Sequence, residues 1–317
     1  MNFLTAYQNG IYAVDALYLR PRLAAVHLIV EDGRVALVDT GTNDSLLRVM
    51  GALDELGASV EQVDYILLTH IHLDHAGGAG LMMRRFPHAR LVVHPRGVRH
   101  MVDPSKLIEG ATAVYGKEEM ARLYGDVLPI DPARIIEATH DLRLDLAGRQ
   151  LHILDTPGHA RHHVCIRDEQ TGHIFTGDAF GLSYPEFDVD GRQFVYPGTT
   201  PVQFDPEEMH ASIDLLMSFN PGAIYLTHFG QVRDVPDTAR EMHRLIDVYV
   251  EIARRHKDAG RARHELIRDG LAQLMEKEIA TIGCPLDSRT VLEFLQHDIE
   301  INAQGLEVWL DSESRTR

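Results

Sequence analysis

The residues best suited to chemistry lie in one short segment, Thr69-His70-Ile71-His72-Leu73-Asp74-His75. Three histidines and an aspartate follow the pattern His-x-His-x-Asp-His within six positions. Imidazole nitrogens and carboxylate oxygens bind zinc, iron and manganese, and the order of affinities alone does not choose among these metals. A single histidine in a loop is usually incidental, whereas four ligand-type residues at this spacing predict a metal site.

The flanking residues indicate what holds this segment in place. Residues 63–68 form an apolar run of strand length, and Ala76-Gly77-Gly78 follows the last histidine. Such a run, bounded by turn residues, is typical of a buried strand. The four residues are therefore expected on a loop that leaves a strand, where a rigid sheet can hold metal ligands.

Four further motifs occur around this segment in a fixed order. They are Leu37-Val38-Asp39-Thr40-Gly41, Asp155-Thr156-Pro157-Gly158-His159, Phe175-Thr176-Gly177-Asp178 and Leu226-Thr227-His228-Phe229-Gly230. Together the five motifs resemble those of the metallo-β-lactamase-fold hydrolases, and they cover roughly residues 20–235. The resemblance is to the glyoxalase II, lactonase and RNase Z branch. The commonest class of β-lactamases is disfavoured because it uses a cysteine ligand, which these motifs lack. Flavodiiron-type members are disfavoured because they carry a glutamate where His72 stands.

The resemblance implies a dinuclear metal centre with seven ligands. It assigns the first metal to His70, His72 and His159, the second metal to Asp74, His75 and His228, and a bridging position to Asp178. The implied cofactors are two divalent metal ions, with zinc favoured and iron or manganese as alternatives. A hydroxide bridging the metals would attack the substrate, because binding to metals lowers the pKa of water to about 7.

Further residues are expected to assist at this centre. Asp74 and Tyr184 are the candidate catalytic residues, Tyr184 as a hydrogen-bond donor to an oxyanion, as in lactonases. Asp39 either accepts a hydrogen bond from a ligand histidine, which would fix its tautomer, or caps a turn. Arg161, His162 and His163 stand where relatives often carry a Pro-Gly-Ser-like sequence, and His163 is either a supporting, a substrate-binding or a structural residue.

Composition limits the classes of protein. The 317 residues are 44% hydrophobic and 25% charged, which is ordinary for a globular protein with one large domain and an appendage, or with two small domains. No apolar stretch is long enough for a membrane span, and no secretory signal is recognisable at the N-terminus. Two cysteines fit a reducing compartment, so a cytoplasmic protein is expected. The net charge of −16, without a basic run, argues against a nucleic-acid partner.

The order of elements predicts an α/β fold. Helical and strand patterns alternate along the chain, as expected for sheets covered by helices. The resemblance specifies a four-layer αββα metallo-β-lactamase sandwich with a C-terminal helical appendage. The expected domains are a catalytic domain over residues 1–235, with a helical insertion at about 103–140, and a helical region over residues 236–317.

Three segments have two interpretations each. The insertion at 103–140 is either a partial lid or a surface excursion. Residues 179–205 carry six aromatic residues, which either form a wall of the substrate site or pack the segment onto the body. The C-terminal helices either cap the substrate site or form a homodimer.

The function favoured by these observations is a dinuclear hydrolase of a small ester, thioester or lactone. The alternatives are a mononuclear iron persulfide dioxygenase, an RNase Z-like nuclease or phosphodiesterase, and a metal-dependent sensing protein without turnover. The sequence does not name the substrate, because this fold supports many reactions through variation of its loops.

Overall fold

The computed structural model describes residues 3–316 and divides into two compact units. The first unit contains the residues up to Asp155, His162–Gly177 and Pro221–Arg233. The second unit contains Thr156–Arg161, Asp178–Asn220 and the residues from Asp234 onward. The chain passes from the first unit to the second for the last time at Arg233–Asp234, next to the expected domain boundary at 235. The 178–220 segment, however, is grouped with the C-terminal helices.

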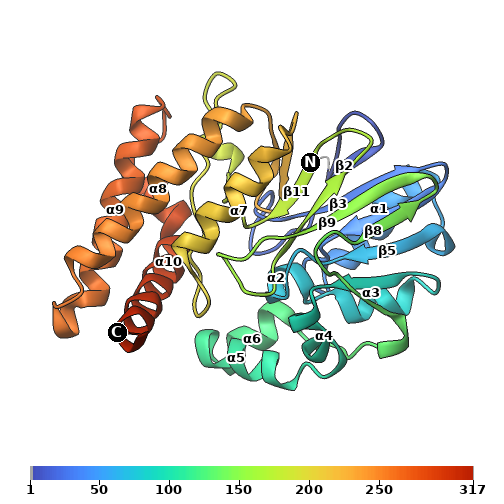
Figure 1. Cartoon of the computed structure of the whole chain (residues 1–317), viewed down its shortest axis with the longest axis horizontal. Helices are drawn as coiled ribbons and strands as arrows, with labels where there is room; N and C mark the ends of the chain where they lie inside the picture. Colours follow the sequence, from blue (N-terminus) through green and yellow to red (C-terminus); the bar gives the residue numbers. More distant parts are fainter. Residues whose placement is uncertain (1–2, 317) are drawn as a thin grey trace. The chain divides into compact units, whose positions relative to one another are not determined.

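The first unit holds two sheets; β3 of the first sheet and β9 of the second are labelled in Figure 1. The first sheet has seven strands in sequence order. Its strands are β1 (Leu4–Ala6), β2 (Ile11–Asp15), β3 (Ala25–Glu31), β4 (Arg34–Val38), β5 (Val63–Leu67), β6 (Arg90–Val93) and β7 (Ile135–Glu137). A hairpin turn at Asp32-Gly33 joins β3 to β4, with both residues at positive φ, as a two-residue hairpin turn requires. From β4 to β7 the strands pair in parallel, so their carboxyl ends lie at one edge.

The second sheet has six strands in the order β13-β12-β11-β10-β9-β8. Its strands are β8 (Arg143–Leu146), β9 (Arg149–Asp155), β10 (Val164–Asp168), β11 (Ile174–Gly177), β12 (Ile224–Leu226) and β13 (Gly230–Val232). All neighbours pair antiparallel except β11 and β12, which run parallel. The carboxyl ends of β11 and β12, which precede Asp178 and His228, therefore also lie at one edge.

The alternation of side chains along β4 shows how the layers are formed. Val35 and Leu37 point into an apolar cluster shared with the helices of this unit, whereas Ala36 and Val38 point into the cluster between the two sheets. Both faces of β4 are buried, which explains its nearly continuous apolar sequence. The helices of the first unit are α1 (Ser45–Glu55), α2 (Leu73–Ala76), α3 (Ala79–Arg85), α4 (Pro95–Val102), α5 (Ser105–Tyr115) and α6 (Lys117–Tyr124), with short 3₁₀ turns at Val60–Gln62 and Pro132–Arg134.

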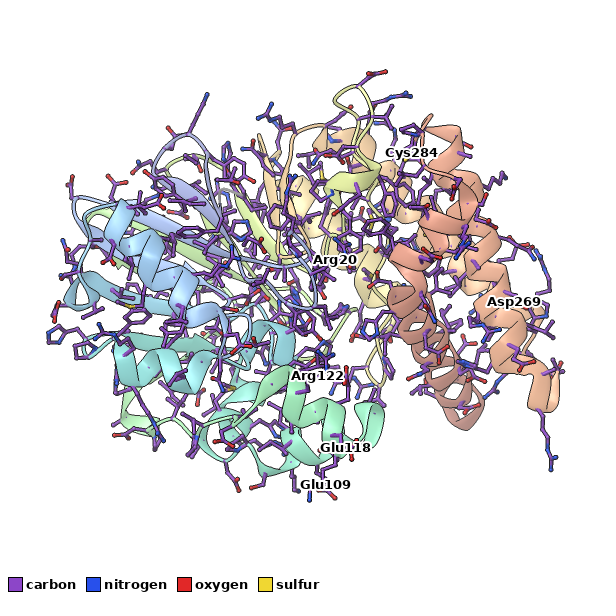
Figure 2. All side chains as sticks on the ribbon, turned by 180° about the vertical axis from the view of Figure 1, so that it is seen from behind. Arg20, Glu109, Glu118, Arg122, Asp269 and Cys284 are labelled. Atoms are coloured by element: carbon purple, nitrogen blue, oxygen red, sulfur yellow. The ribbon has the colours of Figure 1, made fainter. Side chains whose placement is uncertain are left out.

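The segment at 103–140 is an integral part of the first unit. Tyr124 of α6 is buried in the helix-side apolar cluster, and its hydroxyl lies 2.7 Å from that of Tyr18. The segment ends in β7, which extends the first sheet. Its outer surface is polar, and Figure 2 shows Glu109, Glu118 and Arg122 there with exposed side chains.

The second unit is built on four helices, α7 (Pro206–Ser218), α8 (Val235–Arg255), α9 (Arg263–Thr281) and α10 (Ser288–Thr316), with short 3₁₀ turns at Pro185–Phe187 and Gly260–Ala262. The six aromatic residues of the 179–205 segment are buried, and Phe187 and Phe204 contact Phe294 and Trp309 of α10. Of the two interpretations, packing onto the body therefore describes these side chains. Within residues 3–316, no helix is both long and apolar enough to cross a bilayer.

One histidine between the sheets is neutral for structural reasons. His27 of β3 is buried, with its ring edge-on to Phe175 and Tyr225 at 5.5 and 5.6 Å between ring centres. Loss of hydration on burial lowers the pKa of His27 to about 4, although the nearby charge of Asp39 acts in the opposite direction. The side chain therefore stays uncharged in the folded protein at neutral pH.

We expect His27 to make the protein less stable in mild acid. In the unfolded chain His27 binds a proton below its pKa of 6.5, whereas in the folded chain it stays unprotonated down to about pH 4. Stability that is present above pH 6.5 is therefore lost as the pH falls through this window. Going from about pH 7 to about pH 5, His27 should lower the free energy of unfolding by about 2 kcal/mol. Between these two pH values, the free energy of unfolding measured in urea should fall by about 2 kcal/mol less in His27→Phe than in the wild type. The exposed His88→Phe is the control, and an unchanged pH dependence in His27→Phe would contradict the assignment.

Candidate metal centre

The seven predicted ligands are distributed over both units. His70, His72, Asp74, His75 and His228 belong to the first unit, and His159 and Asp178 belong to the second. Each set is described within its own unit.

The His-x-His-x-Asp-His segment follows β5, as expected, and ends in the single turn of α2. His72 is the residue before α2, and Asp74 and His75 lie on it. The turn rests directly on the backbone that follows β4: the amide of Thr40 donates to the carbonyl of His75 at 2.7 Å. A Cβ atom on Gly78 would lie 2.6 Å from the carbonyl oxygen of Thr42, so only glycine permits this approach.

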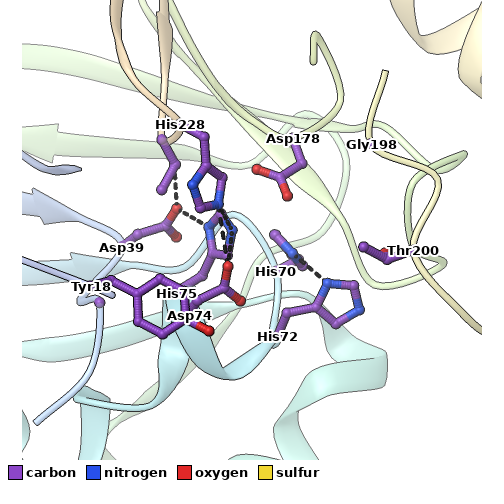
Figure 3. Close-up of polar contacts among 12 residues, drawn as sticks. Tyr18, Asp39, His70, His72, Asp74, His75, Asp178, Gly198, Thr200 and His228 are labelled. Atoms are coloured by element: carbon purple, nitrogen blue, oxygen red, sulfur yellow. Dashed lines mark hydrogen bonds and ion pairs between the residues drawn. The ribbon is translucent and has the colours of Figure 1, made fainter. Parts of the chain in front are cut away.

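Asp74, His75 and His228 form a compact cluster (Figure 3). The Nε2 atoms of His75 and His228 are 3.2 Å apart, and Oδ2 of Asp74 lies 3.2 Å from Nε2 of His228. Nδ1 of His75 faces Oδ2 of Asp39 at 2.7 Å, and Nδ1 of His228 faces the carbonyl oxygen of Leu23 at 2.8 Å. Both partners only accept hydrogen bonds, so each Nδ1 carries a proton. In the neutral form of each ring, the lone pair of Nε2 then points inward. Two lone pairs and a carboxylate that converge in this way fit a divalent metal ion.

His70 and His72 form a second pair in the same unit. Nε2 of His70 lies 2.9 Å from Nδ1 of His72, and Nδ1 of His70 lies 3.1 Å from the hydroxyl of Thr69. His162 and His163, which the sequence singled out, lie beside this pair. The ring of His163 is 5.0 Å from that of His70, and the ring of His162 is 5.6 Å from that of His72.

His159 and Asp178 come together in the second unit. Nδ1 of His159 donates to the carbonyl oxygen of Gly198 at 2.9 Å, and its Nε2 lies 3.4 Å from Oδ2 of Asp178. His159 therefore has the same polarity as His75 and His228, with its proton on the outer nitrogen. Both side chains are buried.

Asp39 makes the hydrogen bond to a candidate ligand histidine, His75, that was one of its two expected roles. It is fully buried, and besides His75 it accepts hydrogen bonds from the amide and hydroxyl of Thr69 and from the hydroxyl of Thr227. Its φ of +60° is in the left-handed region, which aspartate tolerates better than most residues. The two threonines were missed in the sequence, although each directly precedes a predicted ligand, His70 and His228. That shared position is a signal that could have identified them.

Tyr184 is buried in the second unit, and its hydroxyl donates to Asp298 of α10 at 3.2 Å. This contact is the kind that a packing residue makes. Its role as an oxyanion donor stays a prediction.

Comparison with known proteins decides the family. The profile described as the metallo-beta-lactamase superfamily matches residues 19–228, which is more than half of the chain. This chain belongs to the metallo-beta-lactamase superfamily. The predicted αββα sandwich with a C-terminal helical region is thereby confirmed.

Several relatives are similar to this superfamily protein over most of their length. A metallo-beta-lactamase fold-containing protein of Sulfurisphaera tokodaii is 23% identical over 303 residues, 94% of this chain and 96% of its own. A hydroxyacylglutathione hydrolase of Xanthomonas euvesicatoria is 27% identical over 255 residues, 80% of this chain and 77% of its own. The crystal structure of a metallo-beta-lactamase family protein from Thermus thermophilus matches with a TM-score of 0.65 at 25% identity, over 92% of this chain and 95% of that one.

Membership in the superfamily is consistent with metal binding by the histidine and aspartate clusters. Most members of the superfamily are metal-dependent hydrolases that bind divalent metals, typically zinc. The inward lone pairs of His75 and His228 fit this chemistry.

We expect Asp39→Asn to weaken metal binding. The amide offers one acceptor oxygen where the carboxylate offers two, so a donor among His75, Thr69 and Thr227 must face an NH₂ group. Loss of such a supporting contact typically lowers metal affinity by about 10–100-fold. Competition with a chromophoric chelator measures the change, with Asp54→Asn on the surface of α1 as the control. Wild-type affinity in Asp39→Asn would show that this carboxylate does not support the ligands.

Proposed function

We propose that this protein is a hydrolase that holds two divalent metal ions and acts on a small ester, thioester or lactone. The observation that carries the proposal is the common polarity of His75, His228 and His159. Each has its Nδ1 on an acceptor and its Nε2 directed at another ligand-type group. A bound cation would stabilise this arrangement, because inward lone pairs and carboxylates otherwise repel one another.

The ligand assignment follows the family's pattern. His70, His72 and His159 would hold one metal, Asp74, His75 and His228 the other, and Asp178 would bridge them. When bound, the metals supply Lewis acidity toward the substrate oxygen and a water of lowered pKa as the nucleophile. The chain's own part is to fix the tautomer and the orientation of the imidazoles: Asp39 and the carbonyl oxygens of Leu23 and Gly198 do this by accepting hydrogen bonds from the Nδ1–H groups.

The substrate class is supported by the relatives and by charge. Several relatives are named hydroxyacylglutathione hydrolase, which is a name for hydrolysis of an acylated thiol. The chain's net charge of −16 disfavours a polyanionic substrate such as RNA. We therefore propose a small-molecule substrate with a reactive carbonyl group.

Metal content of the protein, purified without added metal, tests this proposal. We expect close to two metal ions per chain by plasma mass spectrometry, and hydrolysis of an acyl-glutathione thioester or a lactone that a chelator abolishes. His228→Ala should retain about one metal and lose most activity, whereas the exposed His88→Ala should keep both metals and full activity.

A different outcome would favour the oxygenase alternative. One iron per chain, with no further uptake when zinc or manganese is offered, contradicts the dinuclear hydrolase. Oxygen consumption with a persulfide substrate would then identify a mononuclear dioxygenase.

A further inference from the structure

The C-terminal helix α10 carries a buried polar side chain in its interior. Asn302 is only 4% exposed. Asparagine is unfavourable inside helices, because its amide competes with the backbone for hydrogen bonds. A buried amide also costs free energy unless its donors and acceptor are satisfied. Both costs indicate that Asn302 has a specific partner.

That partner is the backbone of residues 197–199. Oδ1 of Asn302 accepts from the amide of Thr199 at 2.6 Å and from its hydroxyl at 3.1 Å. Nδ2 of Asn302 donates to the carbonyl oxygen of Pro197 at 3.3 Å. The side chain thus holds the peptide units on both sides of Gly198.

Gly198 in turn orients His159. Its carbonyl oxygen accepts the Nδ1 proton of His159 at 2.9 Å, and the hydroxyl of Thr200 lies 3.3 Å from Nε2 of the same ring. A Cβ atom on Gly198 would lie 2.7 Å from the side chain of Leu182 and 3.5 Å from Nδ1 of His159. The ring therefore lies directly against a segment of backbone that Asn302 fixes.

The backbone of α10 lies very close to the backbone of this segment. A Cβ atom on Gly305, one turn after Asn302, would lie 1.5 Å from the carbonyl oxygen of Thr199. The helix backbone and the 197–199 backbone are therefore in direct contact. On its other side, His159 follows Gly158, whose carbonyl accepts from the amide of Asp205 at 2.8 Å, just before α7.

We propose that Asn302 is a positioning residue for the metal ligand His159, acting through Thr199 and Gly198. The inference rests on the proposed function, in which His159 binds the first metal. It makes the C-terminal helix part of the metal centre's support, and its effect is to keep the proton of His159 on Nδ1 and the lone pair on Nε2.

The tautomer of His159 provides a direct test on the full-length chain. Heteronuclear NMR of the imidazole nitrogens, with His159→Gln to assign the signal, should show the proton on Nδ1 in the wild type. Asn302→Leu removes the amide at similar volume, and we expect a mixture of tautomers because the Gly198 carbonyl is no longer fixed. Asn302→Asp keeps the acceptor oxygens for Thr199 and should retain the Nδ1 proton.

Metal affinity gives the second readout. In cobalt titrations, Asn302→Leu should bind one of the two equivalents about 10–100-fold more weakly, as expected for loss of a supporting contact, and it should be the equivalent that His159→Gln loses. Ile279→Ala removes buried volume from α9 and controls for lost stability. Wild-type affinity and tautomer in Asn302→Leu would overturn the inference, and so would equal losses in Ile279→Ala.

The two proposals fail separately. A wild-type chain that binds no metal refutes the proposed function, and the tautomer measurement still decides whether Asn302 orients His159. A wild-type chain that binds two metals, with Asn302→Leu indistinguishable from it in both readouts, refutes only the positioning role.

Discussion

One buried carboxylate joins the parts of the chain that form the candidate metal centre in the first unit. Asp39 follows β4, and its oxygens accept hydrogen bonds from Thr69 after β5, from His75 on α2 and from Thr227 after β12. These three donors follow strands of both sheets, so Asp39 links the ends of the two sheets to the His75 side chain. A buried charge is tolerated only when its hydrogen-bonding capacity is filled, and here the donors that fill it belong to the ligands or to residues adjacent to them.

The topology explains why Asp39 can do this. β4 and β5 are neighbouring parallel strands in the first sheet, and β11 and β12 are the parallel pair of the second. Parallel neighbours present their carboxyl ends at the same edge, which is where loops most often carry functional groups. Asp39 and His70 follow the first pair, and Asp178 and His228 follow the second.

What the sequence could predict depended on how local the signal was. The candidate ligands His70, His72, Asp74 and His75 lie within six positions and could be found directly in the sequence. Asn302 and Thr199, by contrast, are 103 residues apart, and their contact depends on how α10 packs in the second unit. An asparagine in a helix gives no indication of its partner. The aromatic residues of 179–205 fitted a substrate wall and a packed core equally well, because composition does not reveal which side of a segment is covered.

The supporting groups also differ between the ligands, and this difference has chemical consequences. His75 donates its Nδ1 proton to a carboxylate, His228 and His159 donate to backbone carbonyls, and His70 faces a hydroxyl. A negatively charged acceptor raises the basicity of an imidazole more than a neutral one does, so Nε2 of His75 is the strongest donor among these histidines. Asp74 adds a second negative charge to the same cluster. The His75 side chain therefore lies between two carboxylates, Asp39 at its Nδ1 and Asp74 near its Nε2. The candidate ligand histidines therefore differ in electronic character, although the side chain is the same in each.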